Sequence, residues 1–367
     1  MLYVSTRGKT DLVSSAHAIT RGLAGDGGLF VPQNIPAMRM VDIKAMEHKP
    51  YTERAIDVLL QYLTDFSEDE LRECVNAAYA KDKFGDNPVP LVQVNENTGV
   101  LELWHGPTSA FKDMALQLLP HLLTRSMNKT GETNKVVILV ATSGDTGKAA
   151  LEGFADVEGT QIIVFYPSEG VSDIQKRQMI TQTGKNVKVF GIEGNFDDAQ
   201  RGVKEIFGNT AMSDELEKKG YTFSSANSIN WGRLVPQIVY YFSAYVDAVK
   251  AGKIAAGDAI NFVVPTGNFG DILAGYYAKL MGLPIDRLLC ASNSNNVLTD
   301  FINSGVYDKR RDFYKTISPS MDILVSSNLE RLLYNVSDGD AVRVAEYMQR
   351  LNNEGFYQVD SDDLKRI

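Results

Sequence analysis

The stretch VVILVATSGDTGKAA, residues 136–150, places a continuous apolar run directly before a loop of small and polar residues and a helix-forming segment. The apolar run is far too short to cross a bilayer and predicts a buried strand. The same order recurs twice, with strands predicted at 161–167 and 187–191 and helices from about 172 and 196. Apolar strands that alternate with helices predict a parallel sheet covered by helices on both faces.

The alternation extends in both directions from this stretch. Helical spacing predicts two helices before it, and a stretch containing proline and glycine at 81–90 predicts a domain boundary. After it, a further series of helices and strands is predicted, so the fold class is α/β. The remaining ranges are helices near 52–64, 67–80 and 229–250, strands at 259–265 and 287–292, and a helix from 271.

Composition restricts the class of protein and its partners. The 367 residues are 44% hydrophobic and 23% charged, which is enough for two or three globular domains. A net charge of −9 without a basic run argues against nucleic acid or an anionic membrane as the main partner. The first residues show no targeting pattern, and Cys74 and Cys290 are too few for a disulfide framework, so we expect a reducing cytoplasm.

One lysine, Lys112, lies in an unusually apolar stretch of sequence. In HGPTSAFKDMA, residues 105–115, Lys112 is surrounded by apolar and small residues. A lysine kept partly out of water can lose its proton, and the free amine is then a nucleophile. His105 precedes it, and we expect that histidine to orient the lysine rather than to act in catalysis. The four histidines show no metal-ligand spacing, so no metal site is expected.

A second motif, PTGNFGD at 265–271, lies between a predicted strand and a predicted helix. Gly267 and Gly270 let backbone N–H groups approach an anion closely, and the helix dipole favours negative charge. No Lys-Ser/Thr pair follows, so the loop is not a nucleotide-binding P-loop. A phosphate group on a cofactor would fit, and a simple glycine turn is an equally good reading.

The loop at 141–150 crowds four polar residues, Thr142, Ser143, Asp145 and Thr146, at a predicted helix start. N-capping by Asp145 or Thr146 explains one of them but does not need all four. A loop that binds a carboxylate through hydroxyls and amides makes better use of the whole set.

The segment SSANSINWGR, residues 224–233, has the same character at the start of the long helix. N-capping by Ser228 or Asn227 is one reading. The other is a second anion pocket with Arg233 as a fixed cation, and the two readings are close to equal for each residue taken singly.

These motifs in this order resemble the threonine synthase family in its longer bacterial and fungal form. The beginning is similar as well, at YVSTRG (3–8) and GLAGDGGLFVP (22–32), and the resemblance runs from residue 3 to at least about residue 305. It implies the tryptophan-synthase-β-like fold of pyridoxal 5'-phosphate enzymes, fold type II: parallel sheets covered by helices, with a small N-terminal domain. The implied division is an N-terminal domain at 1–90, a small α/β domain at 136–220, and a large cofactor-binding domain formed by 91–135 and 221–367.

The resemblance also implies roles for the four motifs. Lys112 matches the lysine that forms the Schiff base with pyridoxal 5'-phosphate. Many relatives of this fold place an asparagine where Asp145 stands, near the cofactor's ring oxygen. The implied sets are Gly267, Asn268, Phe269, Gly270 and Asp271 for the cofactor phosphate; Thr142, Ser143, Gly144, Asp145 and Thr146 for the substrate carboxylate; and Ser225, Asn227, Ser228 and Arg233 for the substrate phosphate.

The implied reaction converts O-phospho-L-homoserine and water into L-threonine and phosphate, as a step of threonine biosynthesis in the cytoplasm. The expected partner is this small-molecule substrate alone, without nucleic acid or membrane, and the expected assembly is a monomer or a homodimer. Three alternatives stay open: a dehydratase on the same fold, a phospho-lyase that stops at elimination, and a remnant that binds ligand or a partner subunit without turnover.

The end of the chain departs from the family pattern. Family members continue with a segment that completes the large domain and supplies a hydroxyl to the cofactor's pyridine nitrogen, and nothing in 306–367 matches it. We therefore expect the chain to bind pyridoxal phosphate with little or no threonine formation.

Overall fold

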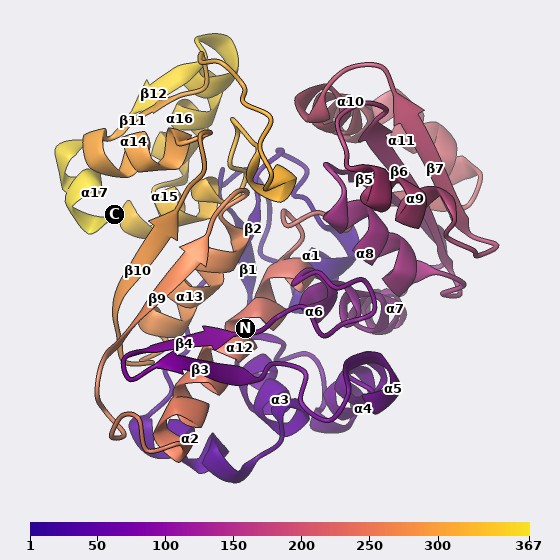
Figure 1. Ribbon diagram of the computed structural model, residues 1–367. Helices are drawn as coiled ribbons and strands as arrows, with labels where there is room; N and C mark the ends of the chain where they lie inside the picture. The colour runs from indigo at the N-terminus through magenta and orange to yellow at the C-terminus, as the bar shows by residue number, and fades with distance from the viewer.

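The computed structural model describes the backbone of residues 1–367 and every side chain except that of residue 197. A long helix, α12 (Trp231–Lys250), runs through the middle of the molecule (Figure 1). Its residues are buried without interruption from Trp231 to Val246. A helix that is buried on every side and mostly apolar belongs in the interior, where it can pack all round. Within the described residues, none of the helices combines the length and apolarity that crossing a bilayer requires.

The predicted parallel sheet is confirmed. Its four strands run in the order β7-β6-β5-β8, and every neighbouring pair is parallel. The strands are β5 (Lys135–Ala141), β6 (Thr160–Pro167), β7 (Val187–Ile192) and β8 (Tyr221–Ser225), and the helices beside them are α8 (Asp145–Phe154), α9 (Asp173–Ile180), α10 (Phe196–Gly208) and α11 (Thr210–Lys218).

Strand β5 explains why both faces of this sheet are covered. Side chains of a strand point alternately to its two faces. Val136, Ile138 and Val140 belong to the main core, which includes Ala149 and Leu151 of α8. The intervening residues of β5 face the other way and pack against α10 in a separate cluster. This cluster consists of Val137, Leu139, Ala141, Phe196, Ala199, Val203 and Ile323. The run VVILVA is therefore apolar throughout because neither face meets water.

Two further strands form a separate parallel pair, β9 (Ile260–Pro265) and β10 (Ile285–Ala291), joined through α13 (Gly270–Leu280). Sequence patterns predict all three elements to within a few residues. An antiparallel hairpin, β3 (Leu91–Asn95) and β4 (Thr98–Leu101), was not among the predicted elements. Strand β9 ends at Pro265 and delivers the chain directly into the PTGNFGD loop.

The N-terminal part is mainly helical and confirms the two predicted helices near 52–64 and 67–80. Strands β1 (Tyr3–Ser5) and β2 (Phe30–Pro32) pair antiparallel beside it. The helices are α1 (Ser15–Arg21), α2 (Met40–Ala45), the short 3-10 helix η1 (Met46–His48), α3 (Tyr51–Tyr62), α4 (Glu68–Ala78), α5 (Lys81–Phe84), α6 (Asp113–Leu116) and α7 (Leu119–Thr130).

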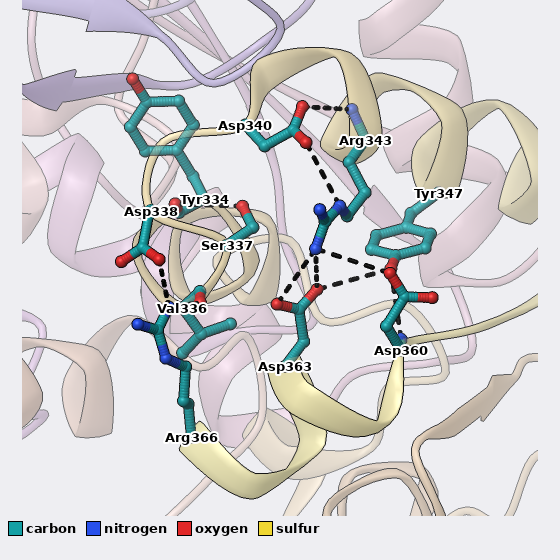
Figure 2. Close-up of polar contacts among 10 residues, drawn as sticks. All are labelled: Tyr334, Val336, Ser337, Asp338, Asp340, Arg343, Tyr347, Asp360, Asp363 and Arg366. Carbon is teal, nitrogen blue, oxygen red and sulfur yellow. Dashed lines mark hydrogen bonds and ion pairs between the residues drawn. The ribbon is translucent and has the colours of Figure 1, made fainter.

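Residues 297–367 form a C-terminal lobe whose last helix is fastened by charge. Figure 2 shows Arg343 of α16 facing two carboxylates near the chain end, Asp363 at 3.2 Å and Asp360 at 3.5 Å, while Arg366 pairs with Asp338 at 2.7 Å. The elements of the lobe are α14 (Val297–Ser304), β11 (Val306–Asp308), the 3-10 helix η2 (Pro319–Met321), α15 (Leu329–Val336), α16 (Ala341–Asn353), β12 (Phe356–Gln358) and α17 (Ser361–Arg366).

A buried arginine joins this lobe to the N-terminal strands. Arg331 of α15 donates hydrogen bonds to the carbonyls of Phe30, Ser228 and Ile229, and to the side chain of Asn328. Burial lowers the pKa of Arg331 to about 10, but four acceptors offset the loss of water. Arg331 therefore holds the 224–230 segment in place through its hydrogen bonds to the carbonyls of Ser228 and Ile229.

Candidate active site

Lys112 lies at the start of α6 and is only 8% exposed. Its Nζ lies 4.2 Å from the centroid of the Phe111 ring and 2.8 Å from Asp145 Oδ2. The next residue, Asp113, is fully buried and accepts hydrogen bonds from the amide and hydroxyl of Thr108. This short loop fixes the backbone on either side of the lysine, so the amine points into the protein rather than into water.

The expectation that His105 orients Lys112 is wrong. His105 is exposed, and its Nε2 lies 2.7 Å from Glu102 Oε2. Trp104 is 49% exposed, so it does not shield the lysine either. His105 is near Lys112 in sequence but not in contact with it, because the chain bends at Gly106. The hydrogen bonds between Thr108 and Asp113 orient the lysine loop instead.

The PTGNFGD loop and Lys112 line one small cavity. Its wall includes Lys112, Thr146, Arg233, the residues from Pro265 to Asp271, and Ser320. A Cβ atom on Gly267 would lie 2.8 Å from the Ser320 carbonyl oxygen, so the loop has no room for a side chain there. The residue with left-handed backbone is Phe269, at φ 63°, which is rare for a bulky residue and marks a strained position.

Asp271 anchors this loop to the central helix. Its buried carboxyl accepts hydrogen bonds from the hydroxyls of Tyr240 and Tyr241 of α12. Burial raises the pKa of Asp271, and the two tyrosines act against that rise. The side chain is thus tied to α12, and the start of α13 keeps a fixed direction toward the cavity.

The loop at 142–146 is organised by Thr142 rather than by a helix cap. The Thr142 hydroxyl accepts hydrogen bonds from the amides of Gly144 and Gly147, at 2.9 and 2.8 Å. The expected N-capping by Asp145 or Thr146 is therefore wrong, because Gly144 occupies the N-cap position and both side chains point elsewhere. Thr146 lines the small cavity, and Asp145 faces Lys112.

Asp145 is an ionised carboxylate in a mostly buried setting. Burial by itself would raise the pKa of Asp145, but the Lys112 ammonium and the Ser320 hydroxyl outweigh it, and the net pKa is lowered. Asp145 and Lys112 therefore form a charged pair whose two partners come from separate motifs.

The expected capping of α12 by Ser228 or Asn227 is also wrong. Asn230 takes that role, accepting from the amide of Gly232 at 2.8 Å and donating to the carbonyls of Ile19 and Ser225. Asn227 and Ser228 are left to line the small cavity. The Ser225 hydroxyl accepts from the Asn227 amide and lines neither this cavity nor the larger one described below.

Arg233 carries a buried charge on which the Asp113 carboxylate acts electrostatically, without a hydrogen bond or ion pair between them among the described side chains. Its side chain is 3% exposed and donates one hydrogen bond, from Nη1 to the Ala226 carbonyl at 2.7 Å. Its Nε is buried without a partner, and no carboxylate pairs with it among the described side chains. Burial lowers the pKa of Arg233 to about 10, so the guanidinium stays charged at neutral pH. A buried cation of this kind would be stabilised by an anion in the cavity that it lines.

A much larger cavity, of about 730 Å³, adjoins the small one. It lies between the N-terminal segment, helices α10 and α11, and the C-terminal lobe, and it shares Asn227, Ser228 and Asn268 with the small cavity. Two oxygens on its wall, Asn268 Oδ1 and Ser327 Oγ, are buried without a hydrogen-bond partner. This volume lies in the range of small-molecule sites and gives access to the glycine loop.

Two residues at the site were not identified from the sequence. Gln175 of α9 donates from Nε2 to Asp145 Oδ1 at 3.0 Å, and the Ser320 hydroxyl donates to Asp145 Oδ2. Ser320 lies 175 residues from Asp145 along the chain. No local motif marks either residue, since only the folded chain brings them to the carboxylate.

Two family models match successive regions of the chain. Residues 2–79 match the family described as "Threonine synthase N terminus", and residues 83–356 match "Pyridoxal-phosphate dependent enzyme". A threonine synthase of Pseudomonas aeruginosa is 42% identical over 362 residues, covering 98% of this chain and 74% of that protein. The human protein threonine synthase-like 1 is also 42% identical, over 96% of this chain and 48% of its own length, so the chain spans about half of that relative.

Solved structures agree over the whole chain. The structure of a threonine synthase from Brucella melitensis with pyridoxal phosphate bound superimposes on this chain with a TM-score of 0.90 and 43% sequence identity. The match covers 100% of this chain and 76% of the Brucella chain. The yeast threonine synthase has a TM-score of 0.88 and 36% identity, with 74% of its own chain covered.

Proposed function

The chain belongs to the threonine synthase family of pyridoxal-phosphate-dependent enzymes, and on this premise we propose that it converts O-phospho-L-homoserine and water into L-threonine and phosphate. The single observation that carries the proposal is the small cavity in which a buried lysine and a buried arginine with a free Nε meet the glycine loop. A reactive amine and an anion site in one cavity are what a phosphorylated aldehyde cofactor requires.

The residues present fit pyridoxal phosphate on chemical grounds. Lys112 supplies an amine in the cavity, and the amides at the start of α13 supply donors for a phosphate. The orphaned Arg233 Nε supplies a further donor, and the absent side chain at Gly267 lets the loop pack closely against the Ser320 carbonyl at the cavity wall. When bound, the cofactor withdraws electrons from the bonds at the substrate's α-carbon.

Arg233 is better suited to the cofactor phosphate than to the substrate phosphate. The resemblance suggests the substrate phosphate, yet Arg233 shares its cavity with Lys112 and the glycine loop and is absent from the wall of the large cavity. We therefore propose Arg233 as the countercharge of the cofactor. Asn227, Ser228 and Asn268, which line both cavities, are proposed to face the substrate, and Ser225 supports them through the Asn227 amide.

The chain's own groups can then be assigned to steps. Lys112 Nζ is proposed to take the proton from the substrate's α-carbon, and Asp145 gives the resulting ammonium a countercharge at 2.8 Å. The loop from Thr142 to Thr146 is proposed to receive the substrate carboxylate. Overall, the Cγ–O bond breaks and releases phosphate, Cβ loses a proton and bonds to the oxygen of water, and Cγ gains a proton. The second proton, released when water adds, leaves with the phosphate. Burial of Lys112 limits access of bulk water to the proton on Nζ.

The direct test is a balance of products. Cofactor-loaded protein is incubated with O-phospho-L-homoserine, and phosphate, threonine, 2-oxobutyrate and ammonia are measured. The proposal expects threonine and phosphate in equal amounts, however low the rate of turnover. A phospho-lyase that stops at elimination is the alternative reaction that this balance distinguishes, because it begins with the same loss of phosphate. It would release phosphate with 2-oxobutyrate and ammonia, and that result would overturn the proposed reaction.

A substitution at Gly267 tests the cofactor loop. Gly267→Ala places a Cβ atom 2.8 Å from the Ser320 carbonyl and 3.3 Å from Met321 Cα, both backbone atoms that cannot swing aside. We expect the loop to shift and the cofactor dissociation constant to rise about tenfold or more. Gly208→Ala is the control, because a Cβ atom there meets open space. Equal cofactor affinity in both variants, measured by titration, would show that the loop does not hold the phosphate.

A further inference from the structure

Residues 309–323, here called the crossing segment, leave the C-terminal lobe and reach the four-stranded sheet (Figure 1). Lys315 Nζ donates to the Glu169 carbonyl at 3.3 Å, and Ile323 is buried in the cluster on the α10 face of the sheet. Between these two attachments the segment forms η2, which carries Ser320 and Met321 into the wall of the small cavity.

The crossing segment is internally braced, so the position of Ser320 is defined. The buried carboxylate of Asp322 accepts four hydrogen bonds, from the Thr316 amide and hydroxyl at 2.8 and 2.7 Å and from the side chains of Asn293 and Asn295 at 2.7 and 3.1 Å. A carboxylate with this many donors fixes the loop around it. Ser320, two residues earlier, therefore has little freedom to leave the cavity.

Asp145 is held by three residues from three separate elements. Lys112 Nζ and the Ser320 hydroxyl both donate to Oδ2, and Gln175 Nε2 donates to Oδ1. Lys112 alone would leave the carboxylate free to rotate about its terminal torsion, which is a soft degree of freedom. The two neutral donors remove that freedom, one on each oxygen, and aim Oδ2 at the lysine nitrogen.

We propose that Ser320 and Gln175 are positioning residues, which hold the Asp145 carboxylate against the Lys112 nitrogen while that nitrogen gains and loses its proton. The inference rests on the proposed function, because it requires Lys112 to be the working amine. The charged groups around that amine are Asp145, Asp271 and, on the same cavity wall, Arg233. Of these, Asp145 is the one in direct contact with Nζ, so its orientation matters most.

The test uses the visible absorbance of the bound cofactor, which requires a proton on the lysine nitrogen and needs no substrate. Asp145→Asn removes the countercharge, so the pH midpoint of this absorbance is expected to fall by about one unit or more. Ser320→Ala is expected to lower the midpoint by about half as much, since the Asp145 charge stays but its carboxylate is no longer held toward the lysine nitrogen. Ser320→Thr keeps the hydroxyl and is expected to restore the wild-type midpoint.

Ser318→Ala is the matched control. Ser318 belongs to the crossing segment, and its hydroxyl contacts Asn293 and Thr316 but not Asp145. We expect an unchanged midpoint in this variant. A midpoint in Ser320→Ala equal to wild type would overturn the proposal, and so would an equal shift in Ser318→Ala, which would reveal general loosening of the segment.

The same variants separate this proposal from the proposed reaction. Ser320→Ala is also expected to lower kcat about tenfold while leaving KM nearly unchanged, as for a residue that acts on the proton transfer. A shifted midpoint together with products other than threonine would overturn the reaction and leave the positioning role supported. A wild-type protein without visible cofactor absorbance would overturn both.

Discussion

Lys112→Ala is expected to abolish covalent attachment of the cofactor and to lower turnover at least about a thousandfold. Alanine has no amine, so borohydride treatment should leave the cofactor free rather than fixed to the protein. The measurement is the intact mass of the protein after borohydride reduction, with threonine formation followed in parallel.

Two variants separate the chemistry of this lysine from its contribution to the fold. Lys112→Arg keeps a cation beside Asp145, yet a guanidinium stays protonated and cannot condense with an aldehyde. It should therefore preserve the fold and still fail to attach the cofactor. Lys129→Ala is the matched control, because Lys129 also pairs with a carboxylate, Glu70 at 2.7 Å, and lies 5.2 Å from the Phe66 ring centroid. Cofactor mass retained on Lys112→Ala would refute the assignment.

Arg233→Met is expected to weaken cofactor binding about ten- to hundredfold while leaving the free energy of unfolding of the cofactor-free protein within about 1 kcal/mol of wild type. The loss of affinity follows from removing a charged donor to a buried phosphate. Stability changes little because two effects oppose each other. The Ala226 carbonyl loses its donor, and the interior loses a buried charge whose Nε has no hydrogen-bond partner.

Arg331→Met provides the contrast for this prediction. Both arginines are buried, and burial lowers the pKa of each to about 10, but Arg331 has four acceptors and Arg233 has one. Arg331→Met should therefore cost about 3 kcal/mol or more of unfolding free energy. Urea denaturation measures both variants. A comparable loss of unfolding free energy in Arg233→Met would identify Arg233 as a structural residue. Unchanged cofactor affinity with a raised KM would instead indicate that Arg233 binds the substrate phosphate.

Local patterns in the sequence were sufficient for β5, β6 and β7 of the central sheet, whereas β8 was not among the predicted strands. The run VVILVA predicts a doubly buried strand because every residue is apolar, and the structure shows its alternate side chains in two different clusters. The helices near 52–64, 67–80 and 229–250 were predicted for a similar reason, since helical spacing of apolar residues depends only on neighbours along the chain.

Short elements with little apolar patterning could not be predicted from the sequence. The hairpin of β3 and β4 is largely exposed, so it lacks the apolar alternation that marks a half-buried strand. Helix caps were misassigned for another reason. Asp145 and Asn227 have the right chemistry for capping, but their side chains are engaged by residues distant in sequence, so Gly144 and Asn230 occupy the cap positions.

The sequence by itself determined the α/β class, the buried lysine and the two polar loops at strand ends, because each depends on residue types within one short segment. Only the tertiary structure decided which of these groups meet. It placed Arg233 beside the glycine loop, turned His105 away from Lys112, and brought Gln175 and Ser320 to Asp145. The physical reason is that a contact across 175 residues arises from the packing of the crossing segment, through Asp322 and Ile323, and leaves no periodicity or motif in the chain.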